Sequence, residues 1–111
     1  MITKRILDTI NGKEVMVHNF QLVYDAYAQY PIIYMDVVFN DVELSLKFSN
    51  ASRLNITNWS FPFQISELLI KYNAGWDNPS KCFIYDFEEE SISFYCEDIE
   101  MLESNNKSIK S

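Results

Sequence analysis

Apolar and polar residues alternate along most of this chain, as they do in β-strands that bury one face. The clearest example is residues 42–49, where every second side chain is apolar and most of those between are polar or charged. Residues 32–39 are nearly all apolar, as in a central strand buried on both faces. The same patterning predicts further strands over residues 15–24, 53–59, 82–87 and 92–101.

Short strands joined by tight turns indicate a mostly β fold. Asn40 and Asp41 suit a two-residue turn with positive φ angles, and residues 73–80 form the longest clear loop. About six or seven such strands predict an antiparallel β-sandwich or an open, barrel-like sheet. We expect one β-rich domain over residues 1–103, followed by a polar tail over residues 104–111 that is disordered.

Two segments have a spacing that also suits a short helix. In residues 2–10 isoleucine recurs at every fourth position, although the Asn11-Gly12 turn that follows could instead join two strands of a hairpin. In residues 63–72 apolar side chains recur at helical spacing after Pro62. A short helix is favoured there over a strand.

The composition fits one globular domain that folds without disulfide or metal support. The chain has 111 residues, 48% of them hydrophobic and 15% aromatic, which is too apolar for a disordered protein. Its formal net charge of −7 repels phosphates, so neither nucleic acids nor membranes are expected partners. The N-terminus lacks a signal-peptide pattern, and no apolar run approaches the ~18 residues of a membrane span. A cytoplasmic location is therefore expected.

Eight of the sixteen carboxylates lie within residues 86–103, a segment whose alternation predicts a β-hairpin. A loop centred on Glu89 would set Cys82 directly opposite Cys96. A two-residue turn at Glu89 and Glu90 would instead point the two cysteines to opposite faces. The second register is favoured because it gathers one apolar face and turns many carboxylates outward. The apolar face would contain Phe83, Tyr85, Phe87, Ile92, Phe94 and Cys96.

Crowded carboxylates repel one another, which indicates that the acidic hairpin has a use. Such a surface suits a basic protein partner, because opposite charge accelerates association. Trp76 lies in a polar loop and is the tryptophan most expected to be exposed. The predicted partner-binding residues are Asp86, Glu88, Glu90, Glu97, Asp98, Glu100 and Trp76.

No motif in the chain specifies catalysis, a metal or a cofactor. His18 is the only histidine and, if the alternation holds, shares a strand face with Phe20, Leu22 and Tyr24. A lone histidine without a nucleophile motif is expected to be structural. The two cysteines lack the further ligands that a zinc site needs and are expected to be reduced core residues. We therefore predict a protein that is not an enzyme and holds no cofactor or metal.

The second half of the chain resembles the small β-rich immunity proteins of bacterial polymorphic and contact-dependent toxin systems. The resemblance is carried by strand patterning in residues 44–48, 54–59, 65–70, 83–88 and 92–100. It implies a non-enzymatic inhibitor that binds and neutralises a cognate toxin made by the same cell. It transfers no catalytic residue to this chain.

The preferred hypothesis is a protein-binding module that presents the acidic hairpin to a basic toxin, such as a nuclease that holds phosphate with cationic side chains. The alternative is a small-ligand or carbohydrate-binding domain that uses Trp59, Trp76 or a tyrosine cluster. Free sheet edges leave a homodimer open as well.

Overall fold

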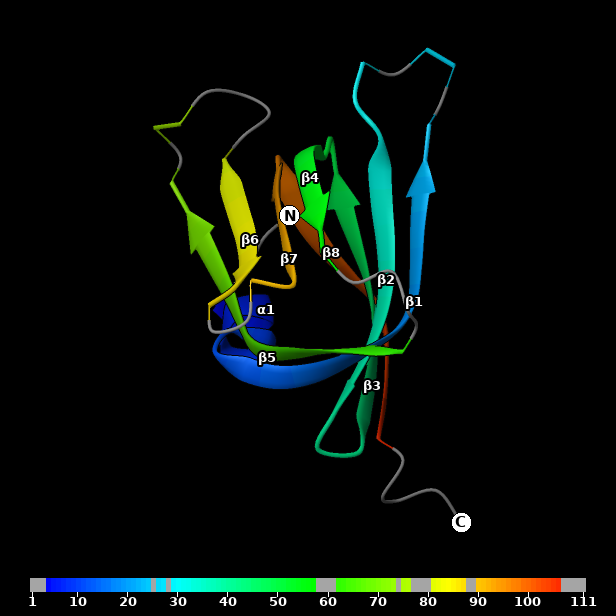
Figure 1. Ribbon diagram of the computed structural model, residues 1–111, viewed down its shortest axis with the longest axis vertical. Coiled ribbons are helices and arrows are strands. Elements are labelled where there is room, and N and C mark those ends of the chain that lie inside the picture. The colour runs from blue at the N-terminus through cyan, green and yellow to red at the C-terminus, as the bar shows by residue number, and fades with distance from the viewer. Residues whose placement is uncertain are drawn as a thin grey trace.

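The computed structural model describes residues 4–24, 26–27, 29–57, 62–73, 75–76, 81–87 and 90–106. This part of the chain forms one short helix and eight strands (Figure 1). They are α1 (Lys4–Ile10), β1 (Lys13–Val23), β2 (Ile32–Phe39), β3 (Val42–Ser49), β4 (Ser52–Ile56), β5 (Phe63–Tyr72), β6 (Cys82–Asp86), β7 (Ile92–Cys96) and β8 (Asp98–Asn106). No helix in the described part is long and apolar enough to cross a membrane.

The eight strands make one antiparallel sheet in the order β4-β7-β6-β5-β1-β2-β3-β8. The sheet curls, so that β5, β6 and β7 stand on one side of the view in Figure 1 and β1, β2 and β3 on the other. Strands β1 and β5 bend strongly, and their bent parts run across the bottom of the sheet between the two sides. The predicted mostly β, antiparallel and barrel-like architecture is confirmed.

The two end strands of the sheet are extensions of inner strands. Strand β3 continues into β4 through Asn50 and Ala51, and β7 continues into β8 through Glu97. The same two chain segments therefore pair twice, as β3 with β8 and as β4 with β7. At the bend, Glu97 N donates to Ser49 O (2.9 Å) and Asn50 Nδ2 donates to Glu97 Oε1 (2.6 Å).

The core fills the inside of the curled sheet. Every second residue of β2, β3, β6 and β7 points inward and is buried. Phe48 of β3 and Phe94 of β7 meet edge to face, with ring centroids 5.0 Å apart and an interplanar angle of 87°. Because these two strands belong to opposite halves of the strand order, the contact joins both halves of the core.

The helix favoured for residues 63–72 is wrong, because this segment is strand β5. Val15 of β1 pairs with Ile65, but Lys13, two residues earlier, pairs with Leu68. One extra residue is therefore inserted into β5 as a β-bulge, and Ile65 and Leu68 both face the core. The bulge explains why the core residues Ile65 and Leu68 are three positions apart, a spacing that in the sequence also suits a helix.

The first segment is the short helix α1, and the Asn11-Gly12 turn joins it to β1. Gly12 adopts φ +78°, a conformation that favours glycine, and its N–H donates to Leu68 O (2.6 Å). Asn11 Oδ1 accepts from Ile70 N (2.8 Å). The turn thus fastens the end of the helix to the bulged part of β5.

Two other local predictions have opposite outcomes. Asn40 and Asp41 have φ angles of 48° and 62°, which confirms the predicted two-residue turn. The predicted disordered tail is wrong for residues 104–106, because they pair with β3 up to Val42 and Asn106. Backbone hydrogen bonds between strands do not require alternating apolar side chains. The polar sequence at the end of β8 therefore did not predict a strand. Residues 107–111 lie outside the described residues.

Candidate functional site

The β6–β7 hairpin has the register in which Cys82 lies opposite Cys96. The next inward pair is Ile84 and Phe94, and all four side chains are buried. The register favoured from the sequence is therefore wrong, and the alternative register, in which the two cysteines oppose each other, is right. As a consequence, the aromatic side chains of β6 point outward.

The two cysteines are core residues, as predicted. Both are free thiols and fully buried, and Cys82 Sγ lies 3.8 Å from Glu97 O. A hydrogen bond with Cys82, together with burial, raises the pKa of the Cys96 thiol far above its ordinary value. Cys96 therefore stays protonated and unreactive in the folded protein.

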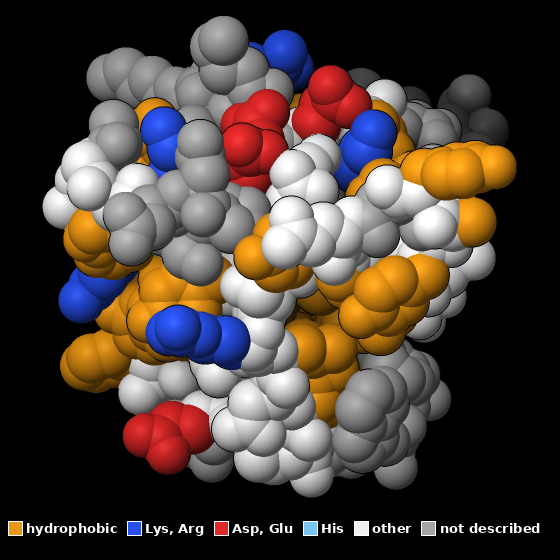
Figure 2. All heavy atoms as spheres, turned by 90° about the horizontal axis from the view of Figure 1, so that it is seen from above, with side chains coloured by type: hydrophobic (Ala, Val, Ile, Leu, Met, Phe, Trp, Pro, Cys, Tyr) orange, Lys and Arg blue, Asp and Glu red, His pale blue; other side chains and the backbone are white. Residues whose placement is uncertain are grey.

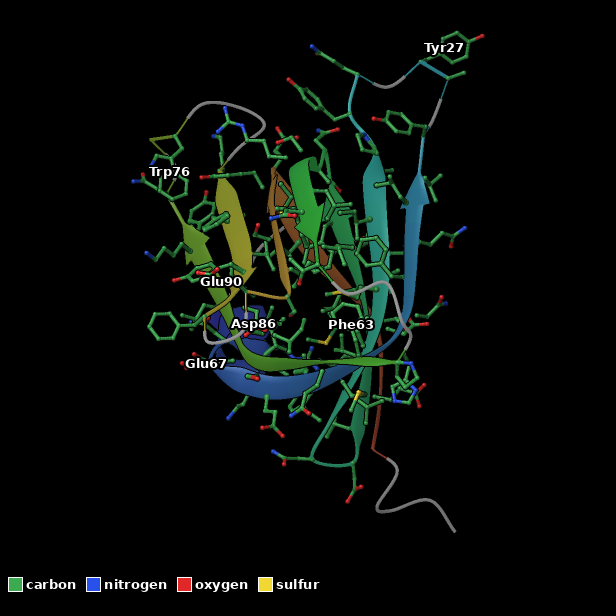
Figure 3. All side chains as sticks on the ribbon, viewed as in Figure 1. Tyr27, Phe63, Glu67, Trp76, Asp86 and Glu90 are labelled. Carbon is green, nitrogen blue, oxygen red and sulfur yellow. The ribbon has the colours of Figure 1, made fainter. Side chains whose placement is uncertain are left out.

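Asp86 is the inward-facing residue that ends β6, with 1% of its surface exposed. Its Oδ2 accepts from Ser91 Oγ (2.7 Å) and Ser91 N (3.4 Å), and its Oδ1 accepts from Glu67 N (3.2 Å). Phe87 N donates to Glu67 O (2.9 Å). The outward direction expected of the Asp86 side chain is wrong, because its buried carboxylate binds both the hairpin turn and the bulge of β5 (Figure 3).

The outer face of β6 and β7 carries a row of stacked rings, which we call the aromatic row: Tyr85, Phe83 and Tyr95. The Phe83 centroid is 4.8 Å from that of Tyr85 and 4.6 Å from that of Tyr95. A cation lies at each end, with Lys71 Nζ 5.6 Å from the Tyr85 centroid and Arg53 Cζ 5.4 Å from that of Tyr95. The face predicted to be acidic is therefore largely aromatic.

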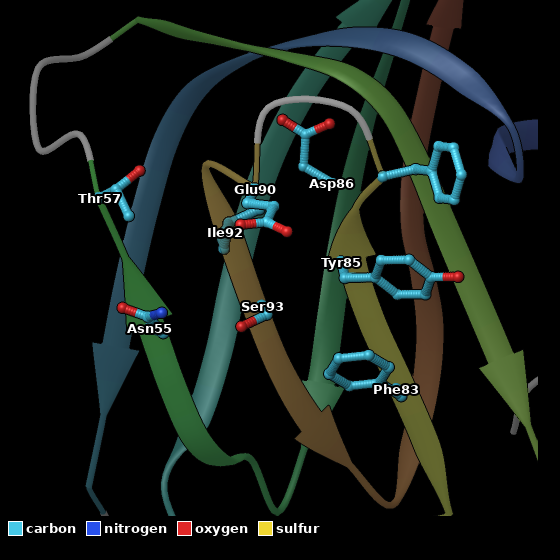
Figure 4. A pocket seen from close by; sticks show the side chains of 9 residues that line it. Asn55, Thr57, Phe83, Tyr85, Asp86, Glu90, Ile92 and Ser93 are labelled. Atoms are coloured by element: carbon cyan, nitrogen blue, oxygen red, sulfur yellow. The ribbon is translucent and has the colours of Figure 1, made fainter.

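A cleft of about 710 Å³ lies beside the aromatic row, over β4, β7 and the β6–β7 turn (Figure 4). It is lined by Asn55, Thr57, Phe83, Tyr85, Asp86, Phe87, Glu90, Ile92 and Ser93. Figure 4 shows Asn55 and Thr57 on one side, the rings of Phe83 and Tyr85 on the other, and Glu90 above Ser93 between them.

The cleft is hollow because a small residue occupies the middle strand. In one cross-strand row, Ser93 of β7 stands between Asn55 of β4 and Tyr85 of β6. In the neighbouring row the corresponding position is Tyr95, whose ring stacks on Phe83 and fills the space. Ser93 and Tyr95 point to the same face of β7, and the serine side chain is much smaller. The surface is therefore hollow at Ser93 and filled at Tyr95.

The remaining predicted acidic residues in the described part differ in exposure and in their place on the sheet. Glu90 is exposed and lines the cleft. Glu97 and Asp98 are half-buried at the β7–β8 bend, and Glu100 is exposed on β8 opposite Lys47. Glu88 lies outside the described residues. Of the predicted acidic side chains in the described part, Glu90 is the one that is both exposed and next to the aromatic row.

Trp76 and Tyr27 lie on two projecting loops at the same end of the molecule (Figure 3). Trp76 is 37% exposed and Tyr27 is 98% exposed. A second, smaller cavity of about 370 Å³ lies near this end and includes Tyr24, Tyr30 and Leu54. Figure 2 looks down on this end and shows exposed hydrophobic side chains interrupted by charged ones. Trp59 lies outside the described residues.

His18 is exposed and lies away from the cleft. The register of β1 with β2 shifts between Val17 and Asn19, so His18 is the extra residue of a bulge. Its predicted place on one face with Phe20 and Leu22 is wrong, because the bulge reverses the alternation at this point. The described residues contain no group of histidine, cysteine or acidic side chains that could hold a metal ion.

No protein-family model, curated protein or solved structure matches this chain.

Proposed function

We propose that this chain is a protein-binding module that acts as an immunity protein and neutralises a cognate toxin. The proposed contact surface is the outer face of β6 and β7, with the cleft at its centre. The observation that carries the proposal is the outward direction of Phe83, Tyr85 and Tyr95, whose rings stack on one another on the outer face of β6 and β7.

Aromatic side chains on the outer face of a sheet suit a protein interface. Large rings supply apolar contact area at a low entropy cost and are enriched among the residues that dominate binding energy. Here the row is held rigid by stacking and by the cations of Arg53 and Lys71. Phe87 extends this apolar surface at the cleft and is 60% exposed.

The net charge of −7 supports a basic partner, as a nuclease toxin would be. The charge acts over a distance and raises the rate of encounter, whereas the aromatic row supplies contact area after docking. This proposal differs from the one based on sequence, in which the acidic side chains themselves formed the contact face.

Binding to a candidate toxin domain, such as one encoded beside the gene for this chain, tests the proposal. We expect Phe87→Ala to weaken binding at least about tenfold, as truncation of an interface anchor does. The matched control is Leu102→Ala on β8, which removes an apolar side chain of similar exposure (50%) and leaves the cleft intact. Kinetics at low and high salt should show the association rate falling as salt rises.

Equal loss of affinity in both variants would contradict the assignment of the contact face. Failure of every candidate toxin to bind, or to lose its toxicity in cells that make this chain, would contradict the proposed function itself.

The cleft also favours a second candidate function, the binding of a small ligand or carbohydrate. Its volume of about 710 Å³ lies within the range of small-molecule sites, and Asn55, Thr57 and Ser93 offer hydrogen bonds. A panel of sugars should then raise the melting temperature of the protein. An unchanged melting temperature across the panel would count against this function.

A further inference from the structure

We infer that the cleft receives an arginine side chain from the partner protein. The inference rests on the proposed function, because it names the chemical group that the partner would insert at the centre of the contact face.

The charge of the cleft lining selects for a cation. The lining includes the exposed carboxylate of Glu90 and no lysine or arginine among its described residues. The amide oxygen of Asn55 and the hydroxyl groups of Thr57 and Ser93 add hydrogen-bond acceptors around it. The negative charge of Glu90 would repel an anionic ligand. A cationic hydrogen-bond donor would be attracted by that charge and could donate to the acceptors around it.

The aromatic residues that line the cleft together with Glu90 favour arginine over lysine. A guanidinium is planar, can form two parallel hydrogen bonds with one carboxylate, and lies flat on aromatic rings. The chain already uses this contact on the same face, where Arg53 lies over the ring of Tyr95 at 5.4 Å. Phe87, which also lines the cleft and is 60% exposed, offers ring surface for the same interaction.

The stacking of the aromatic row disfavours a sugar on the faces of its three rings. A sugar would bind by laying its apolar face on an uncovered ring face. Phe83 is covered on its two sides by Tyr85 and Tyr95, with interplanar angles of 17° and 29°. Lys71 and Arg53 lie over the rings at the two ends of the row.

Titration of the isolated chain with small probes tests the inference without the partner. The probes are the N-acetyl methyl esters of arginine, of lysine and of citrulline, whose side chain is neutral and has nearly the shape of the arginine side chain. Amide shifts in NMR spectra should show saturable binding of the arginine ester at Asn55, Glu90 and Ser93. We expect the lysine ester to bind more weakly and the citrulline ester to cause no saturable shift.

The substitution Glu90→Gln removes the charge while keeping the size, and should weaken binding of the arginine ester by about fivefold or more. The control is Glu14→Gln, which makes the same change at an exposed position of β1 outside the cleft. The same spectra show that each variant is folded.

Two results would overturn the inference: equal binding of the arginine and citrulline esters, or unchanged binding in Glu90→Gln. A toxin that requires Phe87 but tolerates Glu90→Gln would also overturn it while leaving the proposed function standing. Conversely, if the cleft binds the arginine ester specifically but the chain neutralises no toxin, the inference stands and the proposed function is contradicted.

Discussion

A single buried carboxylate determines how the β6–β7 hairpin is built. Asp86 faces inward, where it accepts hydrogen bonds from Ser91 and from the backbone N–H of Glu67. Acidic residues are rarely buried unless their oxygens are bonded in this way, so the sequence alone suggests an exposed side chain. The turn that gives Asp86 these partners also directs its neighbours Tyr85 and Phe87 outward.

We expect Asp86→Ala to destabilise the protein by about 2–3 kcal/mol, because it leaves a serine hydroxyl and two backbone N–H groups without their acceptor. Urea unfolding at neutral pH measures the change. Glu14→Ala, an acidic residue exposed on β1, is the control and should change the unfolding free energy by no more than about 0.5 kcal/mol. Equal midpoints for the two variants would show that Asp86 does not hold the turn.

At the scale of elements, alternation predicts a strand well when only one of its two faces is apolar. In β3 the inward residues are apolar and most outward residues are polar, so both the strand and its direction follow from the sequence. In β6 both faces are apolar: Cys82 and Ile84 form one, Phe83 and Tyr85 the other. The strand was therefore predictable, but its inward face was not.

The bulges in β1 and β5 are a second reason why the sequence does not predict which residues face the core. Strands β1 and β5 each contain a register shift, and each shift reverses which residues face the core. The spacing around Leu68 then imitates a helix, and the alternation around His18 gives the wrong face. The cleft was not predictable either, because it depends on which residue of β7 lies between Asn55 and Tyr85.

The register of β6 can be tested by comparing adjacent alanine variants. Ile84 is fully buried, so Ile84→Ala should lower the free energy of unfolding by about 3 kcal/mol. Tyr85 is half-buried on the outer face, so Tyr85→Ala should cost only about 1 kcal/mol for lost stacking. Chemical denaturation ranks the two. The opposite order would restore the register in which the aromatic side chains form the core.

At the scale of the whole molecule, the fold depends on pairing between distant parts of the chain. Val15 of β1 pairs with Ile65 of β5, and Ser52 of β4 pairs with Tyr95 of β7. Such pairings close long loops before they are stabilised, which slows folding. The pairing of β4 with β7 also brings together the two sides of the cleft.

We therefore expect refolding in milliseconds to seconds, as for other proteins dominated by non-local β pairing. Stopped-flow dilution from urea, followed by aromatic fluorescence, gives the rate. Refolding within microseconds would mean that local structure such as α1 dominates the folding barrier, contrary to this topology.

The bend at Asn50 and Glu97 has a consequence for local unfolding. Because β3 with β4 and β7 with β8 are two continuous segments, the ladders on both sides of the bend are linked through the backbone. They should open as one cooperative unit, so the protected amides of β4 and β8 should exchange their hydrogens with similar opening free energies. Asn50→Ala, which removes the hydrogen bond to Glu97, should speed exchange in both together. A ligand held in the cleft would then protect amides at the far end of β8.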